Sequence, residues 1–361
     1  MAFNSFGEIF SFSTFGESHG SGVGCVVDGV PAGLRIDREF IQSELDRRKP
    51  GKSKYETQRK EDDEVEILSG VFEGVTTGTP IALLIRNKNQ KSKDYSNTKD
   101  LFRPGHADFT YWHKYGIRDY RGGGRSSARE TVARVAAGAI AKLILKELEI
   151  EVLSGVYEIA GVKAKNLDFD FAKRSIIYSL DKRVEEKQKE MIEKARNSHD
   201  SVGGVALVKI KKLPIGIGEP IYKKLDNLLA SAMMSINGVK AVEIGDGIEA
   251  SRLKGSQNND EISKEVFLSN HSGGILGGIS NGEDVDIKVY FKPTPSIFQP
   301  QKTIDKDGNE VICELKGRHD PCIAIRGSVV AEAMAAIVAV DLLLLNMSRR
   351  VENIKKIYER L

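Results

Sequence analysis

The stretch that decides the fold is Ala128-Arg-Glu-Thr-Val-Ala-Arg-Val-Ala-Ala-Gly-Ala-Ile-Ala-Lys-Leu-Ile-Leu-Lys-Glu-Leu148. Its apolar residues recur at three- and four-residue spacing, which places them on one face of an α-helix. Residues 38–48, 221–234 and 330–345 show a similar spacing. Two of the four segments are long enough to form core helices. The sequence therefore predicts a fold organised around long buried helices.

Between these helices lie short runs rich in β-branched residues, which are typical of strands. They cover residues 23–27, 65–67, 81–85, 205–210, 239–244 and 285–291. Strands and helices alternate irregularly and are separated by glycine-rich turns, which favours an α+β fold over a doubly wound one. The charged segment 181–197 has little apolar face, so we expect a solvated outer helix there.

The composition limits the class of protein. A chain of 361 residues that is 40% hydrophobic has ample material for a large core, and a formal charge of +3 from 54 basic and 51 acidic residues does not indicate a general polyanion binder. The three cysteines include no C-x-x-C pair, which argues against a disulfide framework and a zinc ribbon. We find no export signal and no apolar run of membrane-spanning length, so we expect a soluble cytoplasmic protein. No two histidines have the H-x-x-x-H or H-E-x-x-H spacing and no cysteine adjoins His19 or His106 in the sequence, so we expect no metal site.

Three of the six histidines lie in polar loops: His19 in Gly-Glu-Ser-His-Gly, His106 in Arg-Pro-Gly-His-Ala-Asp and His319 in Gly-Arg-His-Asp-Pro-Cys. A loop histidine beside a carboxylate or an arginine can titrate near neutrality and transfer protons. One such histidine is more often a surface or capping residue. Three together favour a functional site.

The segment Tyr120-Arg-Gly-Gly-Gly-Arg-Ser-Ser-Ala-Arg-Glu130 leads from a triple-glycine turn into the long helix. Free amides at a helix start carry partial positive charge, and the glycines let them curl around an oxyanion. Ser126 and Ser127 can cap the helix or bind a phosphate or flavin oxygen. The simpler reading is a serine N-cap after a flexible turn, but Arg125 and Arg129 favour an anion site.

Two further motifs carry weaker signals. The basic loop 46–54 contains Gly-Lys-Ser but lacks the first glycine of a P-loop, and the glycines at 245 and 247 are not followed by a clear helix. A nucleotide-binding phosphotransferase or a nucleic-acid-binding module that uses loop 46–54 remain the alternative functions.

Four motifs, taken together, resemble the signatures of the chorismate synthase family. They are Thr14-Phe-Gly-Glu-Ser-His-Gly, Phe102-Arg-Pro-Gly-His-Ala-Asp, Asp119-Tyr-Arg-Gly-Gly-Gly-Arg-Ser-Ser-Ala-Arg-Glu-Thr and Gly317-Arg-His-Asp-Pro-Cys. The resemblance extends to about residue 345 and is weakest over residues 150–200. It implies one domain over residues 1–361, a layered sandwich of long helices between antiparallel sheets, and a homotetramer.

The resemblance also implies a reaction: a 1,4-anti elimination of phosphate from 5-enolpyruvylshikimate 3-phosphate, which gives chorismate for aromatic amino-acid biosynthesis and requires reduced FMN without net redox change. An external flavin reductant is expected, although the sequence leaves NADPH-dependent reduction open. His19 would donate to the leaving phosphate and His106 to the reduced flavin, with Asp320, Ser18 and Ser127 as a proton relay. The substrate, with two carboxylates and a phosphate, calls for converging cations, and the implied residues are Arg48, Lys54, Arg103, Arg129 and Arg318. The implied FMN contacts are Arg125, Ser126, Ser127, Asn237, Gly238, Gly277, Lys292, Pro293, Thr294, Pro295, Ser296 and Arg318.

Overall fold

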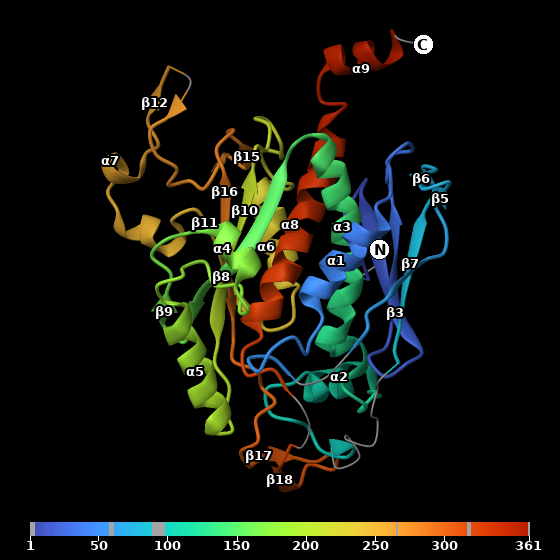
Figure 1. Ribbon diagram of the computed structural model, residues 1–361, viewed down its shortest axis with the longest axis vertical. Helices are drawn as coiled ribbons and strands as arrows, with labels where there is room; N and C mark the ends of the chain where they lie inside the picture. Colours follow the sequence, from blue (N-terminus) through green and yellow to red (C-terminus); the bar gives the residue numbers. More distant parts are fainter. Residues whose placement is uncertain (1–3, 58–60, 89–97, 265, 316–318, 360–361) are drawn as a thin grey trace.

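Two five-stranded antiparallel sheets form the frame of the computed structural model, which describes residues 4–57, 61–88, 98–264, 266–315 and 319–359 (Figure 1). The first sheet has the order β1 (Ser5–Phe6), β2 (Ser11–Gly16), β3 (Gly22–Asp28), β7 (Ile81–Arg86), β4 (Val65–Ile67). The second has the order β11 (Val239–Ile244), β16 (Val285–Phe291), β10 (Gly204–Lys211), β8 (Glu151–Ile159), β9 (Val162–Lys163). The predicted α+β class with antiparallel sheets is confirmed.

Short hairpins and helices complete the described chain. The hairpins pair β5 (Val71–Phe72) with β6 (Val75–Thr76), β12 (Ile262–Ser263) with β13 (Val266–Phe267), β14 (Ile275–Leu276) with β15 (Ile279–Ser280), and β17 (Gln301–Ile304) with β18 (Glu310–Cys313). The α-helices are α1 (Arg38–Arg48), α2 (Asp108–Tyr115), α3 (Thr131–Glu147), α4 (Phe169–Arg174), α5 (Glu185–Asn197), α6 (Leu225–Met234), α7 (Gly255–Asn258), α8 (Ala324–Asn346) and α9 (Val351–Tyr358). Three 3₁₀ turns are η2 (Gly124–Ser126), η3 (Ala128–Glu130) and η4 (Gly247–Arg252).

The two longest helices, α3 and α8, pack against each other in the centre of the molecule (Figure 1). On its other sides α8 packs against β8 and β10, and α3 packs against β3. The helices approach closely at Gly138, where an added Cβ would lie 2.5 Å from the Cβ of Ala333. Glycine is therefore needed at position 138 for the two helix backbones to meet.

A buried ion-pair network centres on Glu332 of α8. Its carboxylate accepts two hydrogen bonds from Arg47 of α1, at 2.7 and 2.8 Å, and one from Ser154 of β8 at 2.6 Å. Lys142 of α3 forms ion pairs with both Glu332 and Glu44. Burial raises the pKa of Glu332, but the charges of Arg47 and Lys142 outweigh burial and hold this pKa well below its usual range. The network joins α1, α3, α8 and β8.

Helix α8 is long and apolar enough to cross a membrane by composition, so the expectation that no apolar run reaches that length is wrong. In the structure, however, 83% of its most apolar window is buried within the protein, as in a core helix of a soluble protein. Near its C-terminal end the buried Asp341 accepts hydrogen bonds from the backbone N–H groups of Glu8, Ile9 and Phe10. Asp341 thus has a structural role, because it holds the chain before β2 against α8.

The charged helix expected at 181–197 starts later, at Glu185, and is more than a solvated element. Its residues Gln188, Ile192 and Ala195 are buried, and Gln188 bonds Ser179 and the carbonyl of Val162. Likewise α6 begins at Leu225 instead of residue 221, where Ile221 and Tyr222 are exposed.

Candidate active site

The triple-glycine turn before α3 adopts a conformation that only glycine enters easily. Gly122, Gly123 and Gly124 have φ values of 67°, 86° and 54°, all in the left-handed region. The chain then passes through η2 and η3 before α3 begins, instead of entering the helix directly as predicted. The Ser127 hydroxyl accepts a hydrogen bond from the N–H of Arg129 at 3.4 Å, so it caps η3.

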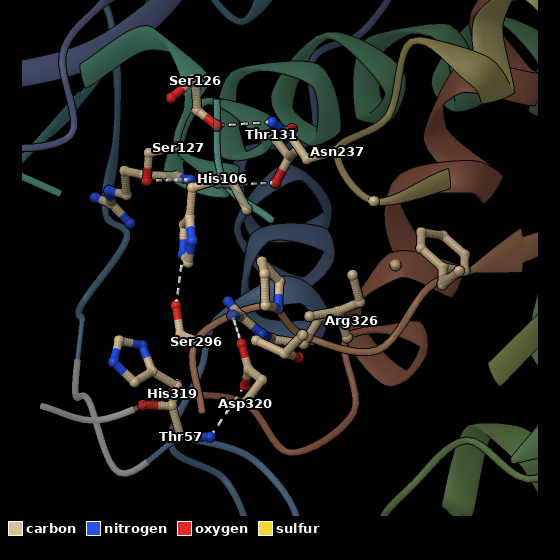
Figure 2. A pocket seen from close by; sticks show the side chains of 18 of the residues that line it. Thr57, His106, Ser126, Ser127, Thr131, Asn237, Ser296, His319, Asp320 and Arg326 are labelled. Carbon is tan, nitrogen blue, oxygen red and sulfur yellow. Dashed lines mark hydrogen bonds and ion pairs between the residues drawn. The ribbon is translucent and has the colours of Figure 1, made fainter. Parts of the chain in front are cut away.

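A cavity of 390 Å³ opens beside this turn, and Gly122, Ser126 and Ser127 are among the residues that line it (Figure 2). Segments from across the chain line it, including the loops around Arg48, His106 and Asp320. Its charged lining is mainly basic and consists of Arg48, Arg103, Arg129, Lys292 and Arg326, with Glu61 and Asp320 as the acidic residues. Such a lining suits a small anionic ligand.

Three of the lining arginines are buried and held by carboxylates behind them. Arg103 makes a bidentate pair with Asp108, at 2.7 and 2.9 Å. Arg48 donates to Asp63 at 3.0 Å, and Arg129 forms an ion pair with the same carboxylate. Burial lowers the pKa of Arg48 to about 10, against the opposing effect of Asp63, so it stays charged at neutral pH.

His106 lies beside Ser296 in the cavity wall (Figure 2). Its Nδ1 is 2.9 Å from the carbonyl oxygen of Pro104, so Nδ1 must carry the proton, and its Nε2 is 2.8 Å from the Ser296 hydroxyl, which can donate to it. Burial, and next the charge of Arg103, lower the pKa of His106 to about 4. His106 is therefore neutral at pH 7.

Asp320 faces the same cavity and is bonded on both oxygens (Figure 2). Oδ1 accepts from the N–H of Thr57 at 3.0 Å, and Oδ2 accepts from Arg326. Although burial works against it, Asp320 raises the pKa of Arg326, so the guanidinium group stays charged. The neighbouring His319 also lines the cavity.

His19 and Ser18 are buried beneath the glycine turn and are not part of the cavity lining. A Cβ added to Gly122, which does line the cavity, would lie 2.5 Å from His19 Cε1 and 3.0 Å from Ser18 Oγ. Arg125 points away from the cavity as well: its guanidinium donates to the carbonyl of Gly16 and the hydroxyl of Thr14. Arg125 thus fastens η2 to the end of β2, directly before the loop that carries His19.

Most residues that the resemblance implied as flavin contacts line the cavity together: Ser126, Ser127, Asn237, Gly238, Lys292, Thr294, Pro295 and Ser296. Pro293 packs behind them, near Gly203. Gly277 lies elsewhere, in the exposed turn between β14 and β15 at the opposite end of the molecule from α2 (Figure 1). Arg318 falls outside the described residues.

The lysines of the basic loop 46–54 form ion pairs and hydrogen bonds with other residues of the chain. Lys49 pairs with Asp46 at 2.8 Å, Lys52 donates to the carbonyl of Arg47 at 2.6 Å, and Lys54 pairs with Glu193 at 2.5 Å. Lys54 is 60% exposed and lies outside the cavity lining. The lysines of the loop therefore do not form the open anion cradle that a phosphotransferase or a nucleic-acid-binding module would need, and its Arg48 belongs to the cavity already described.

Some residues of the site were not predicted from the sequence. Arg326 and Glu61 line the cavity, and Asp63 lies directly behind it. A charged residue at the start of an otherwise apolar helix could have pointed to Arg326, because a buried cation needs a partner. The acidic run 61–64 gives no such signal, since charge runs are usually solvated.

Comparison with known proteins identifies this arrangement. Residues 10–344 match the chorismate synthase family. The chain is 69% identical over 357 residues to a chorismate synthase of Aliarcobacter butzleri, covering 99% of this chain and 100% of that protein. It is 70% identical over 355 residues to one of Nitratiruptor sp., covering 98% and 99%. A crystal structure of a chorismate synthase superimposes with a TM-score of 0.76 at 34% identity over 98% of both chains. The chain belongs to the chorismate synthase family and is a carbon–oxygen lyase of the shikimate pathway.

Proposed function

We propose that the cavity converts 5-enolpyruvylshikimate 3-phosphate to chorismate and phosphate by 1,4-anti elimination, with reduced FMN bound beside the substrate. The observation that carries this proposal is the convergence of Arg48, Arg103 and Arg129 on one cavity. Two carboxylates and a phosphate on one small ligand require several guanidinium groups, which bind such anions in bidentate fashion. Arg326 adds a fourth cation, whereas the exposed Lys54 has no part in the ligand-free pocket.

Another part of the cavity lining suits a flavin. Asn237 Oδ1 and Thr294 Oγ1 are buried there and have no hydrogen-bond partner within the described part of the chain. Buried polar atoms without partners are costly unless a ligand bonds them. With Ser126, Ser127, Gly238 and Ser296 they would hold the ring and tail of FMN. Bound there, reduced FMN would supply transient electron density that helps expel the phosphate and then recover it.

The chain's own titrating groups would move the protons. His106 is neutral in the ligand-free protein, and an anionic flavin beside it would raise its pKa and let Nε2 become a donor. His19, directly under Gly122, would donate to the leaving phosphate once ligand binding shifts the glycine turn. Asp320, with Ser127 and Ser18, would relay the C6 proton of the substrate.

We also infer how the protein works in the cell. A single hydrophobic core includes residues of both sheets and of α1, α3, α6 and α8, which supports one domain over residues 1–361. We expect a cytoplasmic homotetramer that depends on an external reductant for its flavin. Sedimentation would test the tetramer, and NADPH oxidation by the purified protein with FMN would test the reductant.

The decisive experiment is anaerobic turnover of the enolpyruvyl ester with photoreduced FMN, following chorismate absorbance and phosphate release. We expect product only when the flavin is reduced, and none with ATP and magnesium instead. His19→Ala and His106→Ala should each lose roughly two to four orders of magnitude in rate. His113→Ala, at an exposed histidine of α2, is the matched control and should keep the wild-type rate. Absence of product from the wild-type protein would refute the proposed function.

A further inference from the structure

Asp63 is a fully buried carboxylate just outside the cavity. Its side chain is 0% exposed, yet it is not among the lining residues. Its φ of 49° lies in the left-handed region, which aspartate tolerates better than most residues. Gln42 of α1 fixes the backbone on the C-terminal side of Asp63, because its Nε2 donates to the carbonyl of Asp63 and its Oε1 accepts from the N–H of Val65, both at 3.1 Å. The contacts of Gln42 therefore hold the backbone of Asp63 in place.

The two oxygens of Asp63 serve two different arginines of the cavity. Oδ2 accepts from Nη1 of Arg48 at 3.0 Å, and Oδ1 accepts from Nη1 of Arg129. Each guanidinium has a second anchor: Arg48 Nη2 donates to the carbonyl of Ala128 at 3.2 Å, and Arg129 Nε donates to Asn87 Oδ1 at 3.0 Å. Asp63 is the group that connects the two.

One nitrogen of this assembly remains available to a ligand. Arg129 Nη2 is buried and has no hydrogen-bond partner in the ranges that the structure describes. Both arginines line the cavity, and with Asp63 the three groups carry a net charge of +1. A buried cationic nitrogen without a partner is unfavourable unless an anion completes it. The arginine pair is therefore arranged for an anion that the cavity admits.

We propose that Asp63 is a positioning residue, which fixes the guanidinium groups of Arg48 and Arg129 at the separation and orientation that the anionic substrate requires. This inference rests on the proposed function for the identity of the substrate. Asp63 acts through the arginines and does not touch the ligand.

Positioning and simple charge predict opposite effects of removing this carboxylate. Asp63→Asn keeps the size of the side chain and removes one negative charge beside an anion site, so charge alone predicts tighter anion binding. Positioning predicts weaker binding, because an amide can accept through only one atom and its NH₂ group repels the second arginine. A displacement of about 1 Å in such a site costs on the order of 100-fold.

The test compares Asp63→Asn with Asp62→Asn, a matched control at a neighbouring carboxylate that is 67% exposed. We expect Asp63→Asn to raise KM for the ester by about 10- to 100-fold, with a much smaller change in kcat, at a temperature where circular dichroism reports a folded protein. Inorganic phosphate should raise the melting temperature of Asp63→Asn less than that of the wild type. Asp62→Asn should match the wild type in both measurements.

The proposal is overturned if Asp63→Asn has a wild-type or lower KM, or if phosphate stabilises it as much as the wild type. If Asp63→Asn does not fold, Asp63→Glu is measured instead, since it keeps the charge but moves it by one methylene group. Failure of both variants to fold would show a purely structural role and would also overturn the proposal. If wild type and Asp62→Asn alike give no product, the proposed function fails, and the phosphate measurement still decides the role of Asp63.

Discussion

Replacing Glu332 by glutamine should destabilise the protein strongly at neutral pH and less so in acid. The wild-type carboxylate is 3% exposed and accepts bonds from Arg47, Lys142 and Ser154, so the variant leaves two cations without their main partner. Breaking a buried pair from one side costs about 3–5 kcal/mol. Glu44 still pairs with both Arg47 and Lys142, so we expect the lower end, about 3 kcal/mol. For 361 residues this corresponds to a fall of about 4 °C in the unfolding temperature.

The pH dependence separates this ion pair from a packing effect. The folded pKa of Glu332 is depressed, so its contribution to stability is fully present above the unfolded pKa of about 4.3 and is lost as the pH falls below it. The difference between wild type and Glu332→Gln should be about 1 kcal/mol smaller at pH 3.5 than at pH 7. Urea unfolding at both pH values measures it. A Glu332→Gln midpoint equal to wild type, or a difference that does not change with pH, would refute this reasoning.

Two further changes have defined outcomes. Gly138→Ala should lower the unfolding temperature by a few degrees, because the new methyl group would overlap Ala333 and overpacking costs about 1–3 kcal/mol. The control Gly255→Ala has open space at its Cβ and should change the unfolding temperature little. Equal melting curves for wild type and Gly138→Ala would contradict the close packing of α3 and α8. The pKa of His106 is lower in the folded than in the unfolded protein, so its protonation opposes folding and stability should fall as the pH is lowered from 6.5 to 4. In thermal melts over that range His106→Gln should lose less stability than the wild type. If both proteins lose stability equally, His106 is not the source of this pH dependence.

The sequence pattern alone correctly predicted the bounds of those strands that are determined by their own residues. The strands at 65–67, 239–244 and 285–291 have the predicted bounds, because their β-branched residues lie on a half-buried pleated surface. Strand β8 was missed, since Ser154 and Gly155 interrupt its apolar pattern and its place comes from pairing with β10. Helix α8 begins six residues before the predicted 330, where Gly327 contacts Phe291. Its extra turns depend on tertiary packing, which periodicity does not report.

The residues of the candidate site likewise include some that the sequence predicted and some that it did not. Loop motifs pointed to His106, Ser127 and Asp320, which line one cavity. They did not indicate Arg326, which lies in α8 just beyond the last motif, or Asp63, whose role depends on partners far away in the chain. Asp63 bonds Arg129, which lies 66 residues later in the chain, and no local sequence pattern predicts such a contact. The exposed position of Gly277 was equally beyond the reach of the sequence motif.

The central position of α8 has a consequence for how the protein is made. The elements that it packs against most closely, α1, α3, α6, β8, β10 and β16, all precede it in the chain. During synthesis the sheet that contains β8, β10 and β16 therefore leaves the ribosome, together with α3, with apolar faces that this later helix covers. Until then the nascent chain exposes surfaces that favour aggregation, so we expect its yield in the cell to depend on chaperones that hold it until α8 arrives.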